Sequence, residues 1–203
     1  MMMILHGGRL SPFVRRVELW LLAQERPFER RYVSAFDTDF GGLLELNPLG
    51  RVPVLVIEDG TSLFETSAIL DYLEETAPLG RRLVSEQGPA RRQQLQTMGL
   101  AHGIAEKAVA LVYEIERRPS ELQWPEWRAR IEAQIRNGLA ALDKSVGATA
   151  TPLDGVGISA VCAYDMVGRK FPALARPGLV NLERLSGLAS ELPAFAGTHP
   201  ALA

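Results

Sequence analysis

The amino-acid sequence predicts a two-domain protein, in which a small α/β domain precedes an all-helical domain. Two observations lead to this prediction. In residues 1–76, short apolar runs alternate with segments of helical spacing, whereas almost every segment after residue 87 has helical spacing alone. Between them, Ala77-Pro78-Leu79-Gly80 interrupts both patterns. We therefore expect domains at residues 1–76 and 88–203, joined by a linker at residues 77–87.

The chain is expected to begin with a strand, a loop and a well-capped helix. Residues 2–5 form a short apolar run, and residues 6–10 contain two glycines. Ser11 is a good helix N-cap, and Pro12 is favoured at the first helical position. Helical spacing places four apolar residues on the buried face of this helix, namely Val14, Val17, Leu21 and Leu22.

Residues 47–67 carry the densest set of signals in the chain. Asn47-Pro48-Leu49-Gly50 predicts a turn, and residues 52–57 predict a strand. Because Pro53 cannot donate a hydrogen bond to a neighbouring strand, it belongs at the start or edge of a sheet, where nearby backbone groups can face a ligand.

A hairpin and a second helix follow this strand. Asp59-Gly60 is a hairpin signal, and residues 62–64 are expected to form the second strand. Glu65-Thr66-Ser67 then opens a helix, since the next apolar residues, Ile69, Leu70, Tyr72 and Leu73, have helical spacing. The unpaired amides at such a helix start attract a carboxylate.

The second half of the chain predicts several helices. Two apolar stripes are separated by Pro119 and Pro125. The first comprises Met98, Ala101, Ala105, Ala108, Val112 and Ile115, and the second Trp124, Trp127, Ile131, Ile135, Leu139, Leu142 and Val146. Tryptophans at this spacing predict core positions, although they could instead line a substrate pocket. Further helices are expected from Ile158-Ser159 and over residues 176–195.

Composition excludes several classes of function. A formal net charge of -2 and a pI of about 6.0 give no basic field for nucleic acid or an anionic membrane. No apolar run has membrane length and no signal-peptide pattern is present, so we expect a cytoplasmic protein. The single cysteine, Cys162, excludes an intrachain disulfide and a Cys-x-x-Cys centre. The three histidines are far apart in sequence, so no metal is expected.

Residues 47–67, together with Ser11-Pro12-Phe13, resemble the N-terminal domain of the glutathione S-transferase family. The resemblance implies a thioredoxin-like first domain that binds glutathione as a co-substrate. It also implies an all-helical second domain with a pocket for a small hydrophobic electrophile, and a homodimer. Each of these residues taken alone is equally consistent with a simple hairpin and a helix cap. The presence of all of them in the family's order favours the family.

The same resemblance implies roles for the residues that would bind glutathione. Val52 would pair its backbone with the cysteinyl part of glutathione, as an added strand would, and the Val52-Pro53 peptide would be cis. Glu65 would pair with the γ-glutamyl ammonium, and Thr66 would hold the γ-glutamyl carboxylate. Arg51 would reach the glycyl carboxylate.

Ser11 takes the position of the catalytic Ser or Cys of this family. The implied chemistry is the stabilisation of the glutathione thiolate by the Ser11 hydroxyl at a helix N-terminus. A serine cannot form a mixed disulfide, which counts against thiol transfer.

The expected reaction is attack of the thiolate on a hydrophobic electrophile, as in detoxification. Glutathione-dependent isomerisation or peroxide reduction on the same fold remains an alternative, and so does a non-catalytic binding or regulatory protein. One departure from the family concerns its Ser/Thr-x-x-Asp capping box. If Ser159 caps the helix there, Cys162 stands in the place of the aspartate.

Overall fold

The computed structural model describes residues 2–8, 10–33, 40–148, 150–175 and 178–200. The chain divides into two compact units. Unit 1 comprises Met1–Val84 together with Glu191–Ala203, and unit 2 comprises Ser85–Ser190. The closing segment, which the sequence analysis placed with residues 88–203, therefore groups with the first unit.

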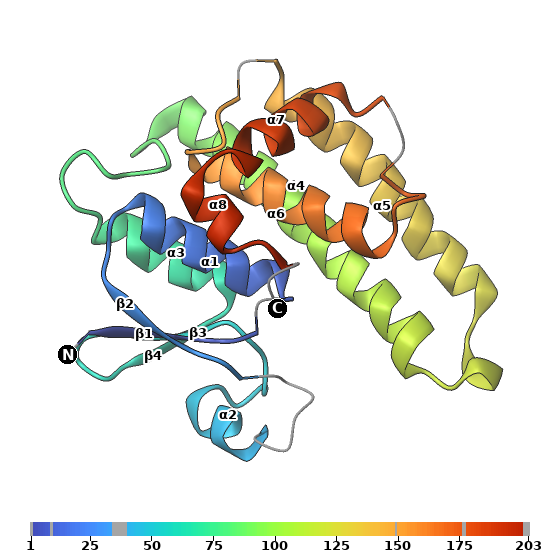
Figure 1. Cartoon of the computed structure of the whole chain (residues 1–203), viewed down its shortest axis with the longest axis horizontal. Helices are drawn as coiled ribbons and strands as arrows, with labels where there is room; N and C mark the ends of the chain where they lie inside the picture. The colour runs from blue at the N-terminus through green and yellow to red at the C-terminus, as the bar shows by residue number, and fades with distance from the viewer. Residues whose placement is uncertain (1, 9, 34–39, 149, 176–177, 201–203) are drawn as a thin grey trace. The chain divides into compact units, whose positions relative to one another are not determined.

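Unit 1 is an α/β unit built on one sheet, with helices α1 and α3 side by side on one face (Figure 1). Its strands are β1 (Met3–His6), β2 (Phe28–Arg31), β3 (Val54–Val56) and β4 (Ser62–Phe64). Its helices are α1 (Pro12–Ala23), α2 (Phe40–Leu46), α3 (Thr66–Glu75) and α8 (Pro193–Gly197). The strand order is β2-β1-β3-β4, with β1 parallel to β2 and the other two pairings antiparallel. This confirms the thioredoxin-like fold.

The core of unit 1 lies between the sheet and its two long helices. Apolar residues of all three are almost fully buried, namely Leu5, Val54 and Leu55 of the sheet, Val14, Val17, Trp20 and Leu21 of α1, and Ile69, Leu70 and Leu73 of α3. Leu22 was predicted on the buried face of α1 but is 38% exposed. It lies in the last turn, beyond residues 12–21, which are buried throughout.

Two elements of unit 1 have no clear sequence signal. β2 reads Phe-Glu-Arg-Arg, and its charges suit an edge strand, because they discourage pairing with another chain. α2 contains two adjacent glycines, which are poor helix formers.

β3 is shorter than the predicted strand 52–57, since Val52 and Pro53 precede it and Ile57 follows it. The predicted cis peptide between these two residues is confirmed.

A buried carboxylate holds the end of α3 to α1 and to residues 83–84, at the end of the first segment of unit 1. Glu74 is 4% exposed. Its Oε1 accepts hydrogen bonds from Trp20 Nε1 and Gln24 Nε2, each at 2.9 Å. The backbone N–H groups of Leu83 and Val84 also donate to the Glu74 carboxylate, at 3.1 Å. Three buried donors and the partly buried Leu83 N–H therefore depend on one side chain for their acceptor.

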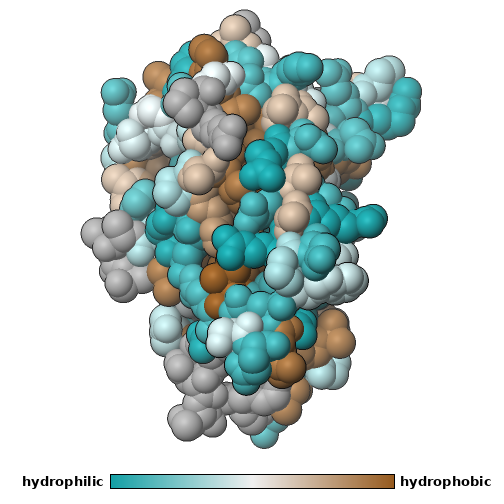
Figure 2. All heavy atoms as spheres, turned by 90° about the vertical axis from the view of Figure 1, so that its right-hand side faces the viewer, coloured by the Kyte–Doolittle hydropathy of each residue, from teal (hydrophilic) through white to brown (hydrophobic). Residues whose placement is uncertain are grey.

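Unit 2 is helical, as predicted. Its α-helices are α4 (Gly88–Val112), α5 (Pro125–Val146), α6 (Gly155–Lys170) and α7 (Val180–Ser190). A π-helical turn, Tyr113–Arg117, and a 3-10 helix, Ser120–Leu122, connect α4 to α5. In the part of the chain that the structure describes, no helix combines the length and the apolar character needed to cross a membrane. Hydrophilic side chains cover most of the face shown in Figure 2, and hydrophobic ones form smaller patches between them.

The predicted apolar stripes form most of the unit 2 core. In the first stripe Met98, Ala101, Ala105 and Ala108 are buried, and in the second Ile131, Ile135, Leu139, Leu142 and Val146. The two tryptophans are not core residues, because Trp124 is 60% and Trp127 is 37% exposed. They occupy the N-cap and the first turn of α5, where the helix has only begun.

The predicted start of α6 is wrong by about one turn. The N-cap is Asp154, whose Oδ1 accepts a hydrogen bond from the Gly157 N–H at 2.7 Å. Ser159 and Cys162 lie inside the helix and are buried, so neither forms a capping box. Gly155 and Gly157 are poor helix formers, so the sequence pattern did not indicate that the helix begins there. Gly157 is required there, because a Cβ would lie 1.9 Å from the Thr151 carbonyl oxygen.

Candidate functional site

The strand register of unit 1 brings three predicted segments to one end of the sheet. His6, at the end of β1, pairs with Val54 at the start of β3, and Val54 pairs with Phe64 at the end of β4. The residues that continue from these strands leave the sheet at the same end. They are the loop to Ser11, the Val52-Pro53 pair and the Glu65-Thr66 pair.

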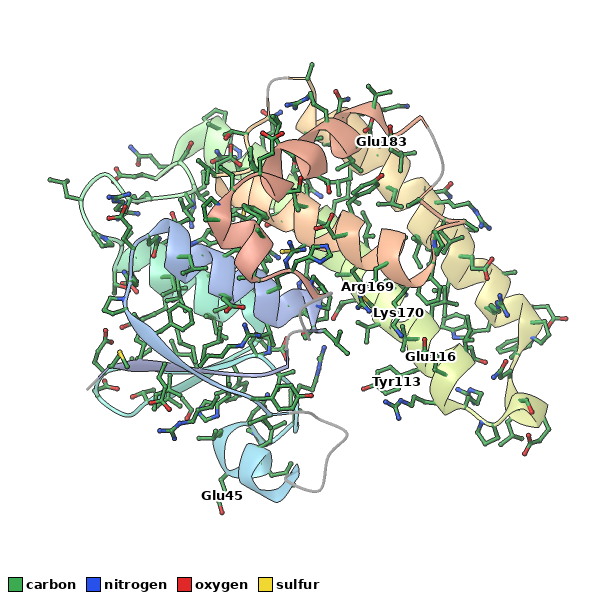
Figure 3. The ribbon with its side chains drawn as sticks, in the orientation of Figure 1. Glu45, Tyr113, Glu116, Arg169, Lys170 and Glu183 are labelled. Atoms are coloured by element: carbon green, nitrogen blue, oxygen red, sulfur yellow. The ribbon has the colours of Figure 1, made fainter. Side chains whose placement is uncertain are left out.

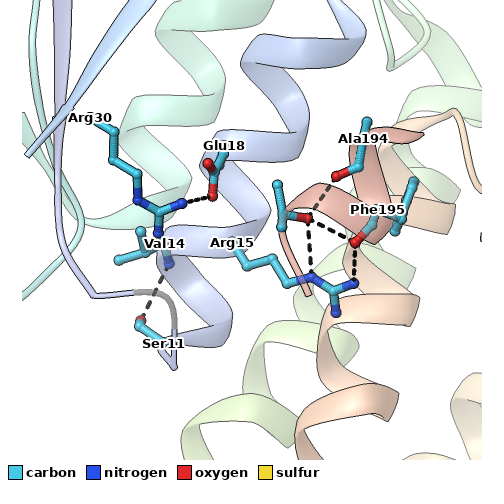
Figure 4. Close-up of polar contacts among 8 residues, drawn as sticks. Ser11, Val14, Arg15, Glu18, Arg30, Ala194 and Phe195 are labelled. Atoms are coloured by element: carbon cyan, nitrogen blue, oxygen red, sulfur yellow. Dashed lines mark hydrogen bonds and ion pairs between the residues drawn. The ribbon is translucent and has the colours of Figure 1, made fainter. Parts of the chain in front are cut away.

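Ser11 is the N-cap of α1, as predicted. It is partly buried, and its Oγ accepts a hydrogen bond from the Val14 N–H at 3.3 Å (Figure 4). A hydroxyl that accepts in this way keeps its own proton for donation to an anion. The first turn of α1 contains no acidic residue, so no carboxylate in that turn opposes the positive end of the helix dipole. The position therefore favours a negative charge next to Ser11.

The loop between β1 and α1 passes very close to the helix. Gly7 has a φ of 149°, which few other residues adopt, and a Cβ there would lie 2.3 Å from Val14 Cγ2. His6, immediately before it, is 7% exposed. Burial, and then the positive charge of Arg31, lower the pKa of His6, while Glu29 acts in the opposite sense. We therefore expect a neutral imidazole at this end of β1.

Helix α1 is fixed by charged groups on both sides (Figure 4). Arg15, one turn after Ser11, is 3% exposed and donates from Nε to Thr198 Oγ1 and from Nη2 to the Phe195 carbonyl, both at 3.4 Å. These bonds hold the α8 segment against α1. Arg30 of β2 forms an ion pair with Glu18 of α1. The helix that presents Ser11 is thus tied to two other elements of unit 1.

A buried asparagine shapes the turn that leads to Val52-Pro53. Asn47 is 1% exposed. Its Nδ2 donates to the Arg51 carbonyl at 2.8 Å, and its Oδ1 accepts from the Leu49 N–H at 3.0 Å. The Gly50 N–H donates to the Asn47 carbonyl at 2.8 Å. The sequence indicated a turn here, but not that its side-chain amide would hold both ends of it.

The start of α3 combines a strained residue with a buried one. Glu65 has φ 64° and ψ 119°, outside the regions that non-glycine residues normally occupy, and such strain is concentrated at functional sites. Its Oε1 lies 3.5 Å from Arg51 Nη1, and both side chains are about half exposed. Thr66 is 3% exposed at the first helical position. All six predicted site residues, Ser11, Arg51, Val52, Pro53, Glu65 and Thr66, therefore lie at or beside the same end of the sheet.

The chain is similar to several known proteins. A family model described as the glutathione S-transferase N-terminal domain matches residues 10–76. An uncharacterized GST-like protein of Escherichia coli is 29% identical over 98% of both chains. A maleylacetoacetate isomerase of Pseudomonas aeruginosa is 31% identical over 78% of this chain and 75% of its own.

A solved structure extends the similarity to the whole fold. The crystal structure of a glutathione transferase family member from Pseudomonas fluorescens, with bound glutathione, superposes with a TM-score of 0.86. It is 28% identical and covers 98% of each chain. With the matched family model, the isomerase relative and the two-unit fold, this similarity shows that the chain belongs to the glutathione S-transferase family.

Proposed function

We propose that unit 1 binds glutathione and ionises its thiol, and that the thiolate then attacks an electrophilic compound. The observation that carries this proposal is the position of Ser11. It caps a helix at the end of the sheet where Val52-Pro53 and Glu65-Thr66 also lie. The proposal is supported by the crystal structure of a glutathione transferase family member with bound glutathione, which is similar to this chain over 98% of its length.

The chemical task of Ser11 is to favour the thiolate over the thiol. A free thiol has a pKa of roughly 8.5, so most of it is protonated at neutral pH, and only the thiolate is a good nucleophile. In our proposal the Ser11 hydroxyl donates a hydrogen bond to the sulfur, and the amides at the start of α1 add their dipoles. Each unit by which the thiol pKa falls corresponds to about 1.4 kcal/mol of stabilisation.

The remaining residues would hold the two ends of the tripeptide. The amide and hydroxyl of Thr66, at the start of α3, suit the γ-glutamyl carboxylate. Glu65 would pair with the γ-glutamyl ammonium, and its exposed ion pair with Arg51 costs little to rearrange. Arg51 would then be available to the glycyl carboxylate. Val52 would offer its backbone to the cysteinyl unit, because β3 begins only at Val54.

Glutathione-dependent isomerisation is the second candidate, and a specific observation favours it. Several relatives are maleylacetoacetate isomerases, including the one from Pseudomonas aeruginosa. An isomerase would need the same thiolate but would return glutathione unchanged at the end of each cycle. Product analysis separates the two, because transfer consumes glutathione in proportion to product and isomerisation does not.

Replacing Ser11 tests the proposal directly. We expect Ser11→Ala to keep most of its glutathione affinity and to lose most of its turnover with any reacting electrophile or isomerisable alkene. Ser145→Ala is the matched control, since Ser145 is an exposed residue of α5 in unit 2, where its Oγ donates to the Ala141 carbonyl. Equal turnover in the two variants would reject the role of Ser11.

A further inference from the structure

A buried arginine lies in the helical turn that Ser11 begins. The Arg15 N–H donates to the Ser11 carbonyl at 3.1 Å, which closes the first turn of α1. Charged side chains are normally exposed, as those of Glu45 and Glu183 are (Figure 3), whereas Arg15 is 3% exposed. A guanidinium that has lost its water needs acceptors from the protein, so the partners of Arg15 restrict where this turn can lie.

Residues 193–198, the closing segment of unit 1, supply acceptors for this guanidinium (Figure 4). Arg15 Nε donates to Thr198 Oγ1 and Nη2 donates to the Phe195 carbonyl, each at 3.4 Å. The guanidinium carbon also lies 5.8 Å from the centroid of the Phe195 ring, within the range of a cation–π contact. Both hydrogen bonds are long, so the attachment depends on the whole set of contacts.

Thr198 is oriented as an acceptor for Arg15. It is 3% exposed, and its Oγ1 lies 2.9 Å from the Ala194 carbonyl oxygen and 3.3 Å from that of Phe195. A hydroxyl has one proton and two lone pairs, so a proton donated to either carbonyl leaves a lone pair for Arg15 Nε. The Phe195 carbonyl lies in the last turn of α8, where carbonyls lack partners within the helix and an arginine can satisfy them.

The closing segment is itself anchored in unit 1. Phe195 is 2% exposed, and α8 packs against α1. Arg15 and Thr198 are 183 residues apart in sequence, so their contact exists only in the folded chain. The same turn of α1 also meets the loop after β1, since a Cβ on Gly7 would lie 2.3 Å from Val14 Cγ2. The turn is therefore held both by this loop and by the closing segment.

The place of this turn decides how well Ser11 can reach a sulfur atom. A hydrogen bond weakens steeply as its distance and angle depart from the optimum, and a functional group must be held to within about 0.5 Å. Arg30 holds Glu18, one turn later in α1, whereas Arg15 holds the turn that Ser11 begins. Loss of the Arg15 contacts should therefore displace the Ser11 hydroxyl more than it disturbs the rest of the helix.

We propose that Arg15 and Thr198 are positioning residues for Ser11, and that the closing segment thereby sets the acidity of the glutathione thiol. This inference rests on the proposed function of Ser11 and extends it to a segment outside the predicted glutathione site. No proton passes through either residue. They fix the distance between Ser11 Oγ and the sulfur.

The pKa of bound glutathione, followed through the ultraviolet absorbance of its thiolate, tests the proposal. Thr198→Val removes the hydroxyl with little change of shape and should raise the thiol pKa by about 0.5 unit or more. It should leave the affinity for the protonated thiol unchanged. Thr198→Ser keeps the hydroxyl and should retain the wild-type pKa. An unchanged pKa in Thr198→Val, or an equal rise in Thr198→Ser, would overturn the proposal.

Thr76→Val is the matched control. Thr76 also accepts a hydrogen bond from an arginine of unit 1, since Arg26 Nη2 donates to its Oγ1 at 2.9 Å. It follows the last residue of α3, whereas Glu65 and Thr66 lie at the other end of that helix. We expect no change of the thiol pKa in this variant. If the rise equalled that of Thr198→Val, it would reflect a general loosening of unit 1 and the proposal would fail. Circular dichroism confirms that each variant is folded.

Ser11→Ala, measured in the same way, separates this proposal from the proposed function. If Ser11→Ala raises the thiol pKa and Thr198→Val does not, Ser11 acts as proposed and the closing segment does not position it. If Ser11→Ala leaves the pKa unchanged, the function proposed for Ser11 is wrong, and the present inference falls with it.

Amide hydrogen exchange tests the positioning role without glutathione. Thr198→Val should speed the exchange of the Val14 and Arg15 N–H groups several-fold, because the first turn of α1 opens more readily, and Thr76→Val should not. Equal exchange of these two amides in the two variants would contradict the positioning role, whatever the protein does with glutathione.

Discussion

Glu74→Ala will destabilise unit 1 by about 4 kcal/mol. The carboxylate is the shared acceptor for the Trp20 indole, the Gln24 amide and the backbone N–H groups of Leu83 and Val84. A buried donor left without a partner costs about 1–3 kcal/mol. Three buried donors and one partly buried donor, each taken at the lower limit because water entering the vacated space will satisfy some of them, give about 4 kcal/mol.

Urea unfolding, followed by tryptophan fluorescence and circular dichroism, measures this loss. The neighbouring Glu75→Ala is the control, since Glu75 is exposed and surface substitutions change stability by about 0.5 kcal/mol or less. Glu74→Gln keeps one acceptor oxygen and should fall between the two. If Glu74→Ala were within about 1 kcal/mol of Glu75→Ala, the four donors would not depend on this carboxylate.

Two further predictions concern the start of α6 and the end of β1. Gly157→Ala should lower the melting temperature clearly, because its Cβ would lie 1.9 Å from the Thr151 carbonyl; Gly168→Ala, with open space around it in the same helix, should be neutral or stabilising by about 1 kcal/mol. If thermal melts gave the two variants the same melting temperature, the close approach at Gly157 would be contradicted. The buried His6 has a pKa below its ordinary value of 6.5, so the unfolded chain binds more protons. The stability that depends on the neutral imidazole is therefore lost as the pH falls below about 6.5, and His6→Gln should flatten the pH dependence of urea stability between pH 5 and pH 7; a pH dependence equal to that of the wild type would contradict this.

The sequence predicted those parts of unit 1 where local chemistry decides the structure. Ser11-Pro12 has the chemistry of a helix start, and the Asp59-Gly60 turn fixes a hairpin; both are found in the structure. β2 and α2 were missed because three charged residues and two glycines, respectively, hide their periodicity. Residues 28–31 form a strand because they pair with β1, and such tertiary contacts cannot be recognised from a local sequence pattern.

Other features depend on contacts between residues distant in sequence. Glu74 looks like any acidic residue at a helix end, and only the fold brings Trp20 and Val84 to it. Likewise, helical spacing placed Trp127 in the core, although its position in the first turn of α5 leaves it exposed. Asp154 has the chemistry of an N-cap, but Gly155 and Gly157, which follow it, are poor helix formers and give no helical signal.

Ionisation of the glutathione thiol at Ser11 is tested most directly by calorimetry of glutathione binding in two buffers of different ionisation enthalpy. The difference between the buffers gives the number of protons released per glutathione bound. We predict that the wild-type protein binds glutathione and releases a proton near neutral pH, whereas Ser11→Ala binds it and releases almost none. Equal proton release by both proteins, or no binding by the wild type, would contradict it.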